Sequence, residues 1–146
     1  MKIINIVDKE VIIEILYDDA SMIHATLGVP LHAVETPDFE ERVGASESTI
    51  EEIGDRLYSL IESKGDYDEY HKLVLQGDSK GRTGKYKTNL KLSKNHIFLL
   101  SKAFKEACLV TKEFDDFHTM TGYEWSQAMQ LQRELEDLVI KITDKK

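Results

Sequence analysis

The sequence predicts a single α+β domain over residues 1–146, with two β-hairpins at about 2–17 and 70–92 and three main helices. Apolar and polar residues alternate strictly at the end of the second hairpin, which places one face of a strand in the core and the other in water. Apolar residues recur at intervals of three and four in the helical segments. The chain is also long enough to bury one core without cross-links. Helices on one face of an antiparallel sheet fit these elements, and a helical body with a protruding hairpin is the alternative.

The first hairpin joins strands at 2–7 and 10–17 through a tight turn at residues 8–9. The second strand is rich in β-branched residues, which suit a pleated, half-buried surface. The two aspartates at 18–19 end this strand and are placed to cap the helix that follows.

A short helix is expected over residues 20–27. Gly28 stands where a helix often ends in a left-handed residue, and Pro30 cannot continue a helix. Residues 29–46 lack periodicity, and we interpret them as a connecting loop.

The first main helix is predicted over about 48–64 and ends at Gly65. Ser48 and Glu51 fit a capping box, in which the serine hydroxyl accepts from the backbone of the glutamate and the glutamate reaches back. The apolar residues on one face of this helix are Ile50, Ile53, Leu57, Leu60 and Ile61.

The second hairpin consists of strands at 70–76 and 85–92 around a glycine-rich loop at 77–84. Tyr86, Thr88, Leu90 and Leu92 alternate with Lys85, Lys87, Asn89 and Lys91. A helix would distribute those lysines around its whole circumference, so the pattern favours a strand.

Two helices at about 93–112 and 121–142 form a predicted antiparallel helical hairpin, because the link between them is short. Ser93 caps the first helix, and Thr121 with Glu124 forms a capping box for the second. The first is apolar on more than one side and is therefore expected to be central. The second carries a seam of Trp125, Ala128, Leu131, Leu135, Leu138 and Ile142.

The net charge of −8 argues against general affinity for nucleic acid or anionic lipid. Residues 77–91 nevertheless contain five cations and one carboxylate, a local charge of +4, so the rest of the chain carries −12. Cys108 is the only cysteine, which fits a reducing, cytoplasmic location. No segment approaches the roughly 20 apolar residues of a membrane span, and we expect no secretory leader at the N-terminus.

The candidate binding residues lie in this basic hairpin: Lys80, Arg82, Lys85, Tyr86 and Lys87. Glycines allow backbone amides to approach an anion, the cations supply charge, and the tyrosine supplies a ring on which a base can stack. The spacing does not match a P-loop. The competing interpretation is that the lysines guard an edge strand and bind nothing.

Catalytic and metal-binding signatures are weak throughout the chain. Cys108 falls on the apolar face of its helix, where a small buried hydrophobe is expected rather than a nucleophile. The acidic link between the last two helices holds Glu113, Asp115, Asp116 and His118, which are metal-ligand types without a known metal spacing. We expect no cofactor.

These observations lead to the hypothesis of a non-enzymatic protein-binding module, such as a phage or mobile-element type inhibitor or adaptor. The alternative is a binder of a phosphorylated ligand, either a nucleotide or a single-stranded nucleic acid, through the basic hairpin 77–91. A hydrolase acting through the acidic helices is a third interpretation. The sequence leaves the partner's identity and homo-oligomer formation open.

Overall fold

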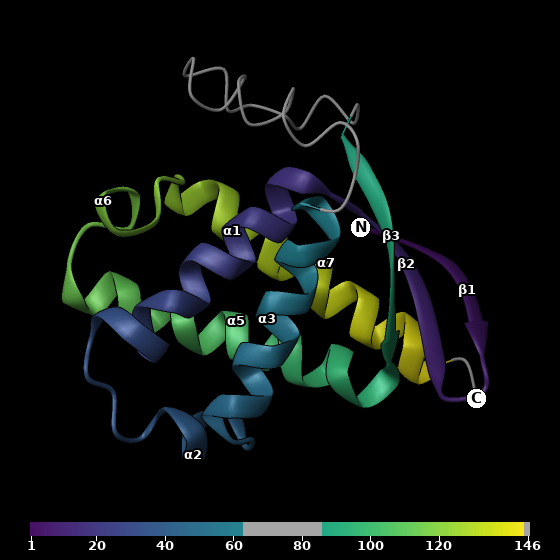
Figure 1. The fold of residues 1–146 in the computed structure, drawn as a ribbon, viewed down its shortest axis with the longest axis horizontal. Helices are drawn as coiled ribbons and strands as arrows, with labels where there is room; N and C mark the ends of the chain where they lie inside the picture. The colour runs from purple at the N-terminus through teal and green to yellow at the C-terminus, as the bar shows by residue number, and fades with distance from the viewer. Residues whose placement is uncertain (63–85, 145–146) are drawn as a thin grey trace.

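The computed structural model describes residues 1–62 and 86–144. A three-stranded sheet stands at one end, and the helices pack against one of its faces, as Figure 1 shows. The strands are β1 (Lys2–Val7), β2 (Glu10–Leu16) and β3 (Lys87–Ser93). The helical elements are α1 (Tyr17–Gly28), the π-helical turn η1 (Val29–Ala33), α2 (Phe39–Val43), α3 (Glu47–Glu62), α5 (Lys94–Phe114), α6 (Phe117–Thr121) and α7 (Trp125–Asp144). The predicted α+β class is therefore confirmed.

The first hairpin has the predicted turn. β1 and β2 pair antiparallel up to Val7 and Glu10, which leaves Asp8 and Lys9 as the turn. Asp8 has a φ of 57°, the sign that the first position of a two-residue hairpin turn requires. The carbonyl of Lys9 accepts a hydrogen bond from the Lys94 N–H at 2.8 Å, which ties the turn to the start of α5.

The alternation predicted over 85–92 is present in β3, which pairs antiparallel with β2. Thr88, Leu90 and Leu92 are buried on the helix-facing side. The lysines between them point to the outer face, so the pattern of period two was interpreted correctly. The strand predicted at 70–76 and the loop at 77–84 lie outside the described residues.

α5 is the central helix, as the apolar residues on more than one of its sides predicted. It packs against α1, α2, α3, α6, α7 and β3. Phe104, Ala107 and Cys108 are fully buried, and Ala103 and Val110 are buried on a second side. Its apolar residues Phe98 and Leu109 are exposed.

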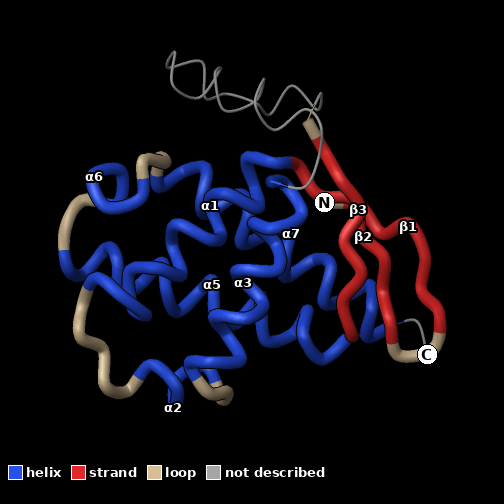
Figure 2. Tube along the Cα trace, viewed as in Figure 1, coloured by secondary structure: helices blue, strands red, loops and turns tan. Residues whose placement is uncertain are grey.

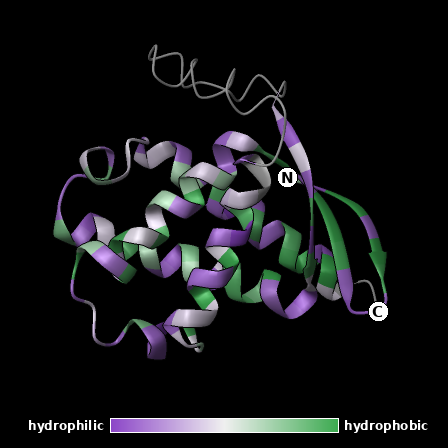
Figure 3. Ribbon diagram, in the orientation of Figure 1, coloured by the Kyte–Doolittle hydropathy of each residue, from purple (hydrophilic) through white to green (hydrophobic). Residues whose placement is uncertain are grey.

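α7 packs against α5 through the predicted seam, of which Ala128, Leu131 and Leu135 are fully buried. The two helices run antiparallel (Figure 1). In Figure 3 the helices carry hydrophobic and hydrophilic stretches in alternation, as expected for helices with one buried face.

Of the three caps predicted for the main helices, two are wrong in detail. Ser93 does cap α5, since its Oγ accepts from the His96 N–H at 3.0 Å. α3 begins one residue earlier than predicted, and the cap is Ser46 Oγ, which accepts from the Thr49 N–H at 3.3 Å, not Ser48. Both serines precede the same apolar face within one turn, so the local signal did not distinguish them.

The cap predicted for the last helix at Thr121 is wrong, because Thr121 is the last residue of α6. Gly122 has a left-handed φ of 82°, which ends α6 and prevents Thr121 from leading into α7. Thr121 Oγ1 donates to the carbonyl of Phe117 at 2.9 Å, within α6. α7 starts at Trp125, and the Glu124 N–H donates to Gln127 Oε1 at 2.9 Å.

The structure also corrects the segment after β2. α1 begins directly at Tyr17, so Asp18 and Asp19 lie inside its first turn and are buried rather than capping an exposed end. Gly28 has a right-handed φ of −61° instead of a left-handed one. The helix continues into η1, where the Val34 N–H donates to the Val29 carbonyl at 2.9 Å.

Residues 29–46 are not the plain loop that the sequence predicted. After η1 the segment contains α2, whose Phe39 and Val43 are buried. Two apolar residues in a five-residue helix are too few to reveal a period, which explains why the pattern was missed.

Two glycine substitutions test this backbone. Gly28 is helical and an added Cβ would meet nothing within 4 Å, so Gly28→Ala should stabilise the protein by about 0.5–1 kcal/mol.

Gly44 has equal space but a φ of 85°, so Gly44→Ala should destabilise the protein by about 1 kcal/mol. Chemical denaturation measures both. Destabilisation by Gly28→Ala would show that the residue is left-handed after all.

Candidate functional site

Of the five candidate binding residues, the structure describes Tyr86 and Lys87. Lys80, Arg82 and Lys85 lie outside the described residues. Tyr86 is 2% exposed, and its ring lies 6.1 Å from that of Tyr17, in the core. At this burial the Tyr86 ring, just before β3, is part of the packing against Tyr17 at the start of α1 and offers no platform for a base. The expected role of Tyr86 in stacking is not supported.

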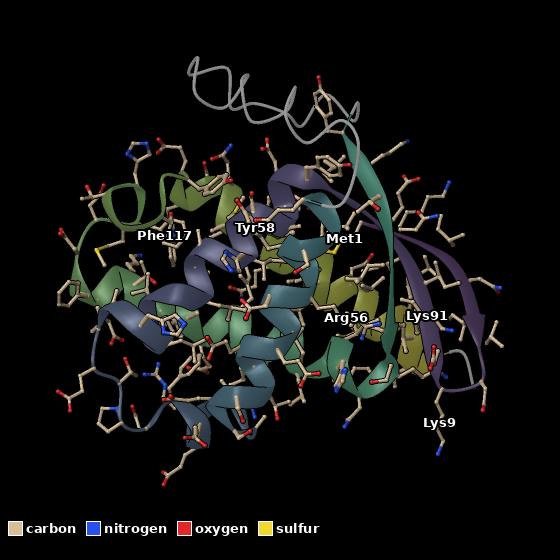
Figure 4. The ribbon with its side chains drawn as sticks, viewed as in Figure 1. Met1, Lys9, Arg56, Tyr58, Lys91 and Phe117 are labelled. Atoms are coloured by element: carbon tan, nitrogen blue, oxygen red, sulfur yellow. The ribbon has the colours of Figure 1, made fainter. Side chains whose placement is uncertain are left out.

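The two lysines of β3 are matched by carboxylates of β2. Lys87 Nζ lies 3.6 Å from Glu14 Oε1, and Lys91 Nζ lies 3.1 Å from Glu10 Oε2. In Figure 4, Lys91 and Lys9 are labelled at the sheet end of the molecule, and Phe117 at the opposite end. The described part of the basic segment is thus a charge-paired sheet surface, as the interpretation of an edge guarded by lysines expects.

The acidic link after α5 forms its own local hydrogen bonds. Asp116 Oδ2 caps α6 by accepting from the Thr119 N–H at 3.3 Å, and Asp115 Oδ1 accepts from the Asp116 N–H at 2.7 Å. His118 Nε2 lies 3.7 Å from Glu124 Oε1. Among residues 1–62 and 86–144, no group of three or more His, Cys, Asp or Glu side chains could hold a metal ion.

A pair of histidine–carboxylate contacts joins α1 and η1 to α3, and the sequence did not reveal it. His24 Nε2 lies 3.3 Å from Asp55 Oδ1, and its ring stacks on that of Tyr58 at 4.6 Å between centroids. His32 Nε2 lies 3.1 Å from Glu51 Oε1. The four-residue spacing of the two carboxylates was a visible signal, but η1, which brings His32 to the same side as His24, was not.

This cluster has little room for chemistry. The hollow beside it measures about 50 Å³, space for water but well below the roughly 300 Å³ at which small-molecule sites begin. Gly54 lets α3 approach α1 closely, since a Cβ there would lie 3.3 Å from Leu27 Cδ1. We interpret the two pairs as exposed contacts between packed helices.

A larger concave surface lies at the end opposite the sheet, where residues 34–37 form a strap between η1 and α2. Figure 2 shows this connection as a loop at the far end from the strands. The strap is flanked by two hollows of about 380 and 410 Å³, which we call together the strap groove. The first is lined by Pro30, Leu31, His32, Ala33 and Glu47, the second by Asp38, Arg42, Val110, Glu113 and Phe114, and both by Val34, Glu35, Thr36 and Pro37.

The strap groove combines an apolar floor with an acidic rim. Phe114 is 59% exposed at one side, although an aromatic ring of this size normally favours burial. The carboxylates of the rim are Glu35, Asp38, Glu47 and Glu113. None of the four forms an ion pair within the part of the chain that the structure describes.

Among the described residues, Arg42 is the one Lys or Arg that lines the strap groove, and it is already engaged. Arg42 Nε donates to Glu106 Oε2 at 2.9 Å, and this bond holds α2 against α5. The surface therefore presents carboxylates and exposed apolar atoms without a free positive charge to match them.

Comparisons of the chain with known protein families, with curated proteins and with solved structures found no match. Within the described residues no helix is both long enough and apolar enough to cross a membrane.

The thiol of Cys108 gives a test of the buried core around α5. Burial raises its pKa from 9.0 to about 12, so the reactive thiolate is scarce at neutral pH. Native protein should resist iodoacetamide at pH 8, whereas denatured protein should be alkylated fully, as measured by intact mass. Equal rates in both states would contradict the burial.

The same shift makes stability depend on pH. Because the folded pKa lies above the unfolded one, the unfolded state loses its proton first as pH rises. The neutral thiol therefore makes its full contribution to the free energy of unfolding below about pH 9. This contribution is lost progressively as the pH rises towards 12. Cys108→Ala should lack this component, so the difference in unfolding free energy between the two proteins should change above pH 9.

Proposed function

We propose that this chain is a non-enzymatic protein-binding module and that the strap groove is the surface that engages another protein. The observation that carries the proposal is the exposed Phe114 beside Val34 and Pro37 of the strap, rimmed by carboxylates that have no ion-pair partner among the described residues. Aromatic anchors surrounded by polar residues are characteristic of protein interfaces. Such a module acts by occupying its partner's surface, as an inhibitor or an adaptor does.

The shape and charge of the strap groove favour a protein over a small phosphorylated ligand. Its two hollows are shallow and lie on either side of one strap, so they suit a chain segment better than an enclosed molecule. The acidic rim repels phosphate groups. The alternative hypothesis, a phosphorylated ligand at the basic hairpin, stays a prediction because Lys80, Arg82 and Lys85 lie outside the described residues.

The proposal predicts that Phe114→Ser weakens capture of the natural partner by about tenfold or more, because truncation of an aromatic anchor at an interface costs about 2 kcal/mol or more. The matched control is Ile140→Ser on α7, since Ile140 is also 59% exposed but does not line the strap groove. Tagged wild type and both variants are incubated with lysate at low salt, and recovered proteins are quantified by mass spectrometry.

Both substitutions lie on the surface, so the two variants should melt within about 2 °C of the wild type. A partner retained by Ile140→Ser and lost by Phe114→Ser supports the proposal. If wild type recovers no stoichiometric protein, or if Phe114→Ser retains it at full strength, the proposal is wrong.

A further inference from the structure

We infer that the partner segment in the strap groove is basic and amphipathic, with an apolar side chain against Phe114 and Lys or Arg side chains facing the rim. This inference rests on the proposed function and adds the chemistry of the partner. It follows from how the charges at the two ends of the molecule are matched.

At the sheet end, the two carboxylates of β2 are neutralised within the molecule. Glu10 and Glu14 pair with Lys91 and Lys87 across neighbouring strands. On α7, Asp137 pairs with Lys141 one turn away at 3.0 Å. A carboxylate that is already paired in this way attracts a cationic partner less strongly than an unpaired one does.

At the strap end, the cations near the rim are engaged elsewhere. Arg42 is bound to Glu106. Lys112, next to Glu113 in the sequence, lies over the Trp125 ring, 4.4 Å from its centroid. The four rim carboxylates and the arginine sum to −3 over the residues that line the two hollows. A cationic segment meets complementary charge there, and an anionic one is repelled.

The apolar floor requires more of the partner than positive charge. Val34, Pro37, Val110 and Phe114 line the second hollow beside Glu35, Asp38 and Glu113. Apolar burial supplies affinity, whereas exposed charges at a rim mainly speed the encounter. The two contributions therefore separate kinetically: loss of rim charge lowers the association rate, and loss of Phe114 raises the dissociation rate.

The test uses synthetic peptides of about four helical turns as probes. One carries Leu on one face and Lys on the other, a second replaces every Leu by Ser at the same charge, and a third replaces every Lys by Glu. Binding is measured by surface plasmon resonance at several salt concentrations. The contact surface is mapped by amide chemical shifts on labelled full-length protein.

We expect the Lys–Leu peptide to bind and to shift the amide signals of Val34, Glu35, Thr36, Asp38, Glu113 and Phe114. Glu35→Gln/Asp38→Asn/Glu113→Gln should weaken binding about tenfold, mainly through slower association, and should flatten the salt dependence. The control Glu52→Gln/Glu136→Gln/Asp137→Asn removes the same charge from exposed positions that do not line the strap groove, and should change affinity less than about twofold.

Equal binding of the Leu-free or the Glu–Leu peptide, shifts that map elsewhere, or equal effects of the two triple variants would overturn the inference. Binding of the natural partner to the variants distinguishes failure of this inference from failure of the proposed function. If Phe114→Ser loses that partner while the rim variant keeps it at an unchanged association rate, the protein-binding function stands and the basic partner is wrong.

Discussion

The burial of α5 on several sides is the constraint on which the rest of the structure depends. Phe104, Ala107 and Cys108 have no exposed surface, and nearly every other described element packs on this helix. A helix buried on one side would need only a sheet or a single partner helix. α5 is covered by both β3 and other helices, and the short α2 also packs against it. α2 contributes only Phe39 and Val43 to the core. The strap groove exists because the chain must cross from η1 to α2 along the end of α5.

Proline and the π-helical turn determine where that crossing starts. Pro30 has no N–H, and its ring would clash with the carbonyl four residues earlier in a regular α-helix. The chain instead widens into η1, whose closing bond joins the Val34 N–H to the Val29 carbonyl. The strap leaves the helix at this bond. The same turn brings His32 to Glu51 and so fastens the start of the strap to α3.

The two ends of the molecule differ in charge because they differ in secondary structure. In the sheet, β2 carries glutamates and the neighbouring β3 carries lysines at diagonal positions of a fixed register, so Lys87 and Lys91 pair with Glu14 and Glu10. The strap and the end of α5 have no such repeating partner. Glu35 and Glu113 form no ion pair within the part of the chain that the structure describes, so this surface is suited to recognition of a cationic partner.

The sequence by itself determined the elements whose apolar residues recur at a regular spacing. The period of two in β3, the seam of α7 and the apolar girth of α5 each involve enough residues to identify the element and its buried face. The tertiary structure decided what depends on single residues or on distant neighbours. Gly28 became helical because η1 continues the turn, Asp18 and Asp19 were buried because α1 starts directly from β2, and Tyr86 was enclosed by Tyr17. The strap groove joins residues about 80 positions apart, and no local pattern records such a contact.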